Sequence, residues 1–575
     1  MRTRDALAVL ASLGLIALVY WPVHHGGFVW DDKLCFHDAG WLHGGNWSQY
    51  MFRGFCDWTD YFRPLVVALY ALQVQGFGGD PGAMHLVSLG LHLVNTLLVG
   101  VLARRLCPHP AFLSAAVMLL YGLHPALVEP VFWIGCQYEM VVVLGALLAL
   151  LSNMTIENSL SRACTVAVAF FLAACAKESA VAIPLLLIVF DLSTQSTGTG
   201  LRATALATLR RQWPVYAMLF GAGLAYLALR HWAIGAISSL LGGEPLISLA
   251  RAQKAALTYL SYWKLLVWPM TGLSPIHPVD DARFAALSGQ SLAIDASAIA
   301  IALGGLLAFC RRAALGSLIM AVSAALLPVL HLVPIQFNES LYHERYAMLA
   351  LAIGCAWLPA AVAPLQRRLL RNVTAAIGLV WLILAVINIR VTLPLWSDEL
   401  ALWQWALREH PDSLVAKQHL LAKYSERGDR MHARALADTL IAENAPCPVC
   451  MLSIAYLALD EGDAARASLA IDRIRNASTV PGDPLFMEEF IIAQGELLEL
   501  QNDPKNAATA YRDAMAIDPA DPRPRMNLAM LLLRLGDLAQ ARANMESALA
   551  LYAPVERAQR RKIFEDAAAA ATVSP

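Results

Sequence analysis

Two adjacent carboxylates, Asp31 and Asp32, follow the first apolar segment of this 575-residue chain in the stretch FVWDD. Apolar residues fill positions 6–23, so we expect the pair at the membrane boundary where a spanning helix ends. Ionisable side chains at that depth are costly and tend to serve chemistry or transport. A carboxylate there could accept the proton of a hydroxyl nucleophile. The simpler alternative is that the two acids cap the exit of the helix in solvated loop.

The composition is that of a polytopic membrane protein. Hydrophobic residues make up 58% of the chain and charged residues 15%, with a mean hydropathy of +0.53, whereas soluble domains run nearer a quarter charged. The net charge of −1 provides no basic field for nucleic acid. Arg2 and Arg4 precede the first apolar run as in a signal peptide, but Trp21 and Pro22 stand where small cleavage-site residues would be. We therefore expect the first helix to be retained.

Eleven apolar windows are long enough to be spanning helices. They lie at 6–23, 84–103, 111–127, 131–151, 163–176, 178–192, 213–230, 293–310, 314–334, 345–363 and 372–394. The arginine clusters between them share one side if 252–290 stays outside as a re-entrant or surface segment, although 252–270 could also span. Cytoplasmic loops collect arginine and lysine. We therefore predict a membrane domain at 1–395 in a bacterial inner membrane, with a cytoplasmic N-terminus and a periplasmic C-terminus.

On this topology the first outer loop, 24–83, shares one face with segments at 124–130, 177–178 and 335–344. Nine charged side chains would then approach the same membrane boundary. They are Asp31, Asp32, Arg63, Glu129, Lys177, Glu178, Glu339, Glu344 and Arg345. Any single one could instead reach to the lipid headgroups, but their meeting on one side predicts a site.

After Pro394 the chain becomes polar, alanine-rich and helical in pattern, and four turn dipeptides recur in residues 396–560. These are Gly428-Asp429, Gly462-Asp463, Asn502-Asp503 and Gly536-Asp537, with their acidic members 34, 40 and 34 residues apart. Thirty-four residues is the period of the tetratricopeptide repeat, and stacked repeats form a groove that binds extended peptide or helix. This predicts a protein-binding α-solenoid followed by a tail at 561–575. A stability or dimerisation module is the alternative.

Two cysteine pairs stand apart from the cysteines of the apolar segments. Cys35 and Cys56 share the first outer loop, and Cys447 and Cys450 form a CPVC motif. If both regions face an oxidising compartment, each pair could be a disulfide. A zinc site needs about four ligands, and a lone CxxC supplies two, so a metal is the weaker interpretation.

An ordered series of motifs resembles the transmembrane-and-tetratricopeptide protein O-mannosyltransferases of the C-type (GT-C) glycosyltransferase superfamily. The series runs over nearly the whole chain: FVWDD (28–32), YFRPLVVALYAL (61–72), HLVSLGLHLVNTLLV (85–99), LHPALVEPVFWIGCQYEM (123–140), AKESAVAIPLLLIVFDL (176–192), YWKLLVWPMTGLSP (262–275), HERYAMLA (343–350) and LWQWALREHPDS (402–413). The resemblance implies an all-α fold, with a GT-C membrane domain followed by repeats. It also implies transfer of a sugar from a polyprenyl-phosphate carrier to an acceptor hydroxyl, with inversion at the anomeric carbon. Two departures bear on the donor sugar: Gln137 with Glu139 where relatives often carry a basic-then-acidic pair, and Trp30 where many carry a polar residue.

The resemblance further implies roles for individual residues. One of Asp31 and Asp32 would be the general base and the other would orient it or the sugar, with a slight preference for Asp32 as the base. Arg345 matches the family's arginine and would clamp the phosphate, because guanidinium can bind phosphate bidentately. The other phosphate candidates are Arg63 and Lys177, and the sugar-binding or supporting candidates are Glu129, Glu139, Glu178, Glu344 and His343. Lys177 and Glu178 could instead neutralise each other, and His343 could be structural.

The lipid-linked sugar is the expected donor substrate, and no cofactor is expected. A divalent cation between the acidic pair and the phosphate is the alternative, since hard cations favour carboxylate oxygen. The expected partners are the bilayer and an acceptor protein held by the repeats. Two other functions stay open. One is a GT-C enzyme that modifies a glycan or lipid, with the repeats as an assembly surface, and the other is a non-enzymatic scaffold or flippase partner.

Overall fold

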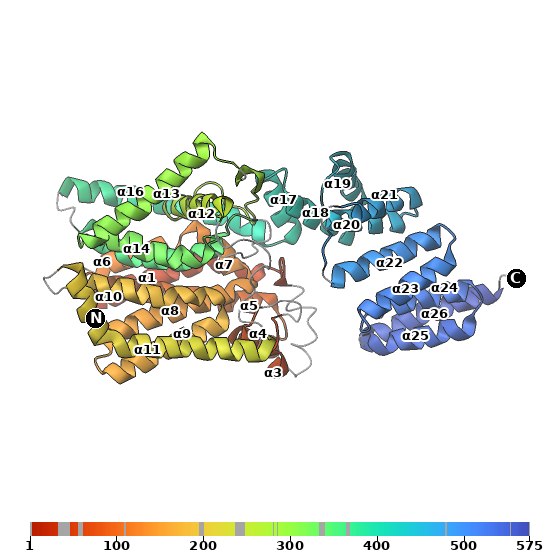
Figure 1. Ribbon diagram of the computed structural model, residues 1–575, viewed down its shortest axis with the longest axis horizontal. Helices are drawn as coiled ribbons and strands as arrows, with labels where there is room; N and C mark the ends of the chain where they lie inside the picture. The colour runs from red at the N-terminus through yellow and green to blue at the C-terminus, as the bar shows by residue number, and fades with distance from the viewer. Residues whose placement is uncertain are drawn as a thin grey trace. The chain divides into compact units, whose positions relative to one another are not determined.

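The computed structural model describes residues 3–573 apart from 33–46, 56–60, 109–110, 195–199, 236–247, 280, 285, 333–339, 364–367, 478–479, 483 and 553 (Figure 1). The described chain is all-helical, as predicted, and its one β interaction is an isolated antiparallel bridge between Pro278 and Ser340. It divides into two compact units, Met1–His410 and Pro411–Pro575. The first unit therefore continues beyond position 395, where the sequence suggested a boundary.

The first unit is a bundle in which helices distant in sequence lie side by side. Its main helices are α1 (Thr3–Tyr20), α4 (Pro64–Phe77), α5 (Pro81–Leu106), α6 (Ala111–Gly122), α7 (Val128–Phe132), α8 (Gln137–Thr155), α9 (Ser159–Ala176), α10 (Ala182–Thr194), α11 (Leu201–Ile234), α12 (Leu249–Val267), α13 (Gly289–Cys310), α14 (Ala314–Leu326), α15 (Met348–Val362), α16 (Arg368–Thr392) and α17 (Glu399–Glu409). Helix α8 packs on α5 and α9, and α9 packs on α11, while α14 packs between α13 and α15 (Figure 1). Short 3-10 turns join several of these helices at one end of the bundle, among them Ile134–Cys136, Glu178–Val181 and Glu344–Ala347.

Eight helices among the described residues are long and apolar enough to cross a membrane. They are Asp5–His25, Pro81–Leu106, Ile134–Thr155, Ser159–Ala176, Leu201–Ile234, Gly289–Cys310, Glu344–Val362 and Asn372–Trp396. A ninth results if Leu113–Gly122 and Pro125–Phe132, which bend by 54°, form one span. The other two predicted windows hold shorter helices, α10 with 13 residues and Ala314–Val329. The count of eleven spans thus stays a prediction, and the ambiguous α12 is not among the eight.

The second unit is an array of antiparallel helix pairs. Its helices are α18 (Leu414–Glu426), α19 (Arg430–Ala442), α20 (Pro448–Asp460), α21 (Ala464–Arg475), α22 (Pro484–Leu500), α23 (Pro504–Ile517), α24 (Arg523–Arg534), α25 (Leu538–Leu551) and α26 (Pro554–Val573). Each helix of the pairs α18–α19, α20–α21, α22–α23 and α24–α25 packs on its partner. The segment predicted as a tail, 561–575, is helical as far as it is described: α26 runs to Val573, and its Phe564 is buried.

The four predicted turn dipeptides lie where these pairs reverse direction. Their first residues have left-handed backbone, with φ values of 68°, 72°, 60° and 83° at Gly428, Gly462, Asn502 and Gly536. Glycine and asparagine adopt this conformation at the lowest cost. The aspartate that follows each of them accepts a backbone N–H three residues later and so caps the next helix. The same two-residue signal therefore ends one helix and starts the next.

Candidate functional site

The two adjacent carboxylates occupy different environments. Asp32 is fully buried, and its Oδ1 accepts the backbone N–H of Gly135 at 2.8 Å while its Oδ2 accepts that of Val29 at 3.5 Å. Asp31 is partly exposed. Burial raises the pKa of Asp32 well above its usual value, against the opposing effect of the Gly135 and Val29 N–H groups. Asp32 therefore anchors the first loop to the turn before α8, and Asp31 is the carboxylate that a substrate could reach.

Burial also raises the pKa of Asp31, to about 6. The positive charge of Arg345 opposes this rise and the negative charge of Glu399 adds to it. A carboxyl group with a pKa in this range can exchange protons near neutral pH, as a general base must. Asp31 is thus suited to proton transfer by both accessibility and pKa.

Arg345 is buried between a carboxylate and aromatic rings. Its guanidinium pairs with Glu129 Oε1, and its backbone N–H donates to Glu129 Oε2 at 2.9 Å. The guanidinium carbon lies 4.8 Å from the ring centre of Trp133, 4.7 Å from that of Tyr346 and 5.7 Å from that of Trp30. These distances are within the range of cation–π attraction. Trp30 directly precedes Asp31, so this contact brings the arginine next to the carboxylate pair.

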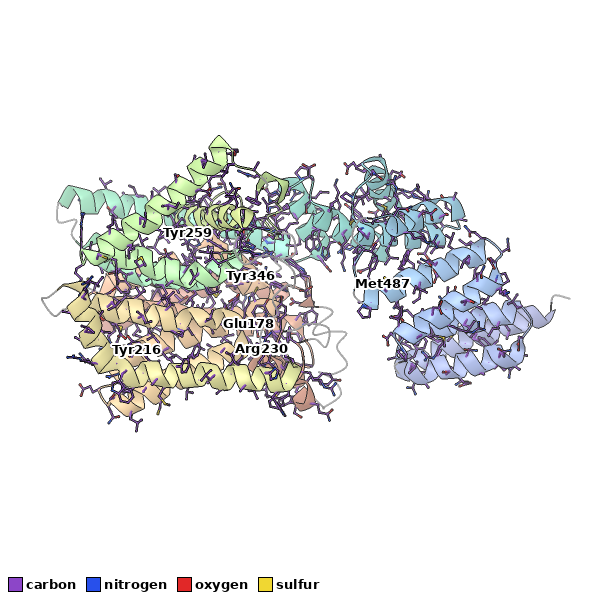
Figure 2. All side chains as sticks on the ribbon, viewed as in Figure 1. Glu178, Tyr216, Arg230, Tyr259, Tyr346 and Met487 are labelled. Atoms are coloured by element: carbon purple, nitrogen blue, oxygen red, sulfur yellow. A yellow bond between two sulfur atoms is a disulfide. The ribbon has the colours of Figure 1, made fainter. Side chains whose placement is uncertain are left out.

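Arg63 and a further arginine meet at one carboxylate. Glu178 lies 3.3 Å from Arg63 Nη2 and 3.1 Å from Arg230 Nη1. Figure 2 shows Glu178 and Arg230 at one end of the bundle. Arg230 lies on α11, and Tyr216 lies farther along that helix. Burial favours a higher pKa for Glu178, but Arg63 and Arg230 outweigh it and hold the pKa below its usual value. Glu178 is therefore ionised and is shared by two cations.

Lys177 does not pair with its neighbour Glu178 in the way that the sequence allowed. Its Nζ pairs with Glu139, whose other oxygen accepts a hydrogen bond from Ser179 Oγ at 3.2 Å. Lys177 follows the end of α9 with an extended backbone, whereas Glu178 begins a 3-10 turn. Their side chains therefore reach different partners. The self-neutralised turn is therefore wrong, and each residue belongs to a separate ion pair.

Two tyrosines connect the three predicted phosphate-binding cations. The ring of Tyr138 lies 4.6 Å from Arg63 and 4.7 Å from Lys177, and the ring of Tyr346 lies 4.3 Å from Lys177 and 4.7 Å from Arg345. We call these five residues the cation–tyrosine row. The row brings together cations that lie up to 282 positions apart in sequence, from Arg63 to Arg345. The sequence analysis predicted that these residues approach one another. Each of the three cations is paired with a carboxylate, and guanidinium and ammonium groups are side chains that can bind phosphate.

Gln137, at a position where the resembled family often carries a charged residue, lies outside the row. It forms a reciprocal amide pair with Gln73, at 2.7 and 3.1 Å, and its Nε2 also donates to Met84 O and Ser88 Oγ. All of its neighbours are neutral, so an uncharged amide satisfies this buried position. Gln137 therefore belongs to the packed interior beside the site and contributes no charge to the row.

His343 and Glu344 hold the segment 273–277 against the site. Glu344 Oε1 lies 2.8 Å from His277 Nε2 and accepts the N–H of Ser274 at 3.1 Å. His343 is fully buried, with Nδ1 3.2 Å from Pro275 O. The ring of His343 also meets those of Trp30 and Tyr346, with centroids 6.0 and 5.6 Å apart, so both residues support the site. His277, from the predicted outer segment 252–290, was missed by the sequence analysis.

Cys447 and Cys450 form a disulfide in the first turn of α20, where Cys447 is the N-cap residue. The other predicted pair, Cys35 and Cys56, lies outside the described residues. Among the residues that the structure does describe, no group of three or more His, Cys, Asp or Glu side chains is placed to hold a metal ion.

Comparison with known proteins finds a family match within the second unit. Residues 498–561 match the tetratricopeptide repeat family, which confirms the prediction for the stretch that contains the turns at 502–503 and 536–537. No curated protein matches the chain. Tetratricopeptide arrays generally mediate protein–protein interaction, and the apolar helices of the first unit are consistent with a membrane protein.

Proposed function

We propose that the protein is a membrane glycosyltransferase that moves a sugar from a polyprenyl-phosphate donor to a hydroxyl group of a protein acceptor. The observation that carries this proposal is the cation–tyrosine row next to Asp31, where Arg345 contacts the ring of Trp30. A lipid phosphate leaving group needs cations, and a hydroxyl nucleophile needs a base. The site offers both within one cluster of buried and half-buried side chains. The resemblance to GT-C enzymes supports the same reaction.

In the proposed reaction, Asp31 accepts the proton of the acceptor hydroxyl as its oxygen forms a bond to the anomeric carbon. The bond between that carbon and the phosphate oxygen breaks on the opposite face, so the configuration inverts. The electron pair leaves on the phosphate, whose added charge is stabilised by Arg345, Lys177 and Arg63. Asp32 keeps Asp31 in place through Gly135. This assignment departs from the slight preference for Asp32 in the sequence analysis, because Asp32 is buried and already bonded.

The acceptor and the membrane side belong to the same proposal. The repeats would hold the acceptor polypeptide, since their family mediates protein–protein interaction. The Cys447–Cys450 disulfide is consistent with an oxidising compartment, which supports a periplasmic second unit in a bacterial inner membrane. An apolar groove between spanning helices would receive the isoprenoid chain of the donor.

The test is a transfer assay with purified protein in lipid nanodiscs, a labelled polyprenyl-phosphate sugar and periplasmic acceptor proteins. Asp31→Asn should lower kcat by about 10²–10⁴-fold, the usual contribution of a general base. Asp80→Asn is the matched control, because Asp80 caps α5 through Ala83 N–H and asparagine caps equally well. Label on a glycan or lipid but never on protein would favour the alternative acceptor class. Full activity of Asp31→Asn would refute the proposed base.

A further inference from the structure

Helix α17 belongs to the first unit. Its position after the last apolar window had instead predicted that it is part of the repeats. The first unit ends at His410, one residue after α17. Trp403, in the middle of α17, is fully buried. Its ring meets the ring of Trp30 edge-on, with centroids 5.1 Å apart and an interplanar angle of 67°. Such edge-to-face aromatic pairs are favourable contacts beyond simple burial.

Trp30 occupies a backbone position that usually belongs to glycine. The chain from Val29 to Asp32 forms a tight turn closed by the Asp32 N–H donating to Val29 O at 3.1 Å. Trp30 is the second residue of this turn and has φ +56°. Turns with positive φ at that position favour glycine, asparagine or aspartate, and a bulky residue there is an outlier that its surroundings must hold.

Several elements hold this turn: Arg345 and His343 meet the Trp30 ring, and a further contact comes from α17. The Trp30 ring stacks on Trp133 with centroids 5.0 Å apart and meets Trp403 on another side. Asp32, at the end of the turn, is bonded to Gly135. The remaining residue of the turn is Asp31. Its position is therefore set by Asp32 on one side and by the Trp30 ring on the other.

A second residue of α17 acts on the same turn. Glu399 lies four residues before Trp403, so both side chains share one face of the helix. The charge of Glu399 reaches Asp31 and raises the pKa of that carboxyl group. The face of α17 that carries Glu399 and Trp403 is thus directed at the turn of the proposed base.

We propose that Trp403 is a positioning residue for the proposed base: by packing against Trp30 it keeps the Val29–Asp32 turn in the conformation that presents Asp31. Helix α17 is then part of the active site as well as the chain segment that leads into the repeats. This inference rests on the proposed glycosyl transfer for its kinetic consequence, but the Trp30–Trp403 contact does not depend on it. Misplacement of a catalytic group by about 1 Å can cost on the order of 10²-fold in rate.

The kinetic test uses full-length variants in the transfer assay. Trp403→Leu should lower kcat at least tenfold and leave KM for the donor within threefold, because each phosphate-binding cation keeps its carboxylate partner. Trp403→Phe, which keeps an aromatic ring, should recover kcat to within threefold of wild type. The matched control is Trp405→Leu, which removes a buried ring of equal size from the same helix. A wild-type kcat for Trp403→Leu, or an equal loss in Trp405→Leu, would overturn the inference.

Glycine at position 30 gives a second kinetic arm. Glycine adopts positive φ without support from a ring, so in a Trp30→Gly background the change Trp403→Leu should have no further effect on kcat. A further tenfold loss in that background would mean that Trp403 acts by another route, and the inference would be wrong.

A thermal double-mutant cycle tests the contact without any activity. The unfolding midpoints of Trp30→Leu, Trp403→Leu and the double variant are compared with wild type. Because the two rings touch, the double variant should lose less than the sum of the single losses. Additive losses would overturn the contact itself. If the losses are non-additive but the wild-type protein shows no transfer activity, the Trp30–Trp403 contact stands and the proposed function is wrong.

Discussion

Glu129 accepts two hydrogen bonds from Arg345, one from its guanidinium and one from its backbone N–H. The two residues are 216 positions apart in sequence, and both are buried. Glu129 therefore fixes the guanidinium and also the first turn of the segment that carries it. Glu129 is thus a support for the proposed phosphate clamp more than a sugar ligand.

Removal of Glu129 should destabilise the protein. Glu129→Ala leaves the buried charge of Arg345 uncompensated, and breaking a buried pair in this way costs about 3–5 kcal/mol. The measurement is the free energy of unfolding in denaturant in mixed micelles. Glu157→Ala is the control, since Glu157 is exposed between α8 and α9, and it should stay within about 0.5 kcal/mol of wild type. Equal stability of the two variants would contradict this account of Glu129.

The rate of transfer should fall in acid as Asp31 becomes protonated. Burial raises the pKa of Asp31 to about 6, and the base acts only when ionised, so kcat should rise with pH through about 6 and be lost below it. Arg345 and Glu399 are the charged groups that act on Asp31, and Asp31 in turn raises the pKa of Asp32.

The charge of Glu399 gives this pH profile a specific test. Glu399→Gln removes a negative charge that raises the pKa of Asp31, so the inflection in kcat should move to lower pH. Glu409→Gln, at the far exposed end of α17, should leave the inflection in place. If both variants keep the wild-type inflection, Glu399 does not act on the base.

Truncation at two points should separate the two roles of the C-terminal segment. A chain ending at His410 keeps α17, so it should still hydrolyse the lipid-linked donor slowly while it loses transfer to protein. A chain ending at 395 also loses Trp403, and donor hydrolysis should fall at least tenfold further. The assay measures release of free sugar from labelled donor, with folding of both chains checked by their unfolding midpoints. Equal hydrolysis by two folded chains would show that α17 is dispensable.

The disulfide in α20 should stabilise the second unit modestly. It closes a loop of only four residues, Cys447 to Cys450, and the loss of chain entropy in the unfolded state is worth roughly 2 kcal/mol. The double variant Cys447→Ser/Cys450→Ser should lower the unfolding midpoint of this unit, whereas Cys310→Ser, an exposed cysteine of the first unit, should not. Thiol labelling before and after reduction then reports the compartment: two reactive cysteines at 447 and 450 in freshly isolated membranes would argue against a periplasmic repeat domain.

The repeats could be predicted because their signal is local. A glycine or asparagine followed by aspartate specifies both a left-handed turn and a helix cap, as at Gly462 and Asp463, and needs no distant contact. The approach of Arg63, Lys177 and Arg345 could also be predicted, since the ends of apolar windows define one boundary.

The partners in the site could not be predicted in the same way. They depend on how each helix is rotated about its axis, which adjacent residues do not reveal. Lys177 and Glu178 are neighbours in sequence but pair with Glu139 and with the arginines Arg63 and Arg230. Arg230 ends an apolar window and could have been suspected, because it is an arginine outside the clusters from which the sequence predicts the cytoplasmic side. The sequence of α17 is rich in apolar residues, but it does not show that Trp403 packs against Trp30, which lies 373 positions earlier.

The ion pairs of the cation–tyrosine row bear on how such an enzyme would complete its cycle. Each cation already has a protein carboxylate: Glu178 for Arg63, Glu139 for Lys177 and Glu129 for Arg345. An incoming phosphate competes with these carboxylates, so its affinity is limited. After the sugar has left, the same carboxylates can recapture the cations and help to expel the spent lipid carrier. The ion pairs would thus lower the affinity for the donor and speed the release of the spent carrier.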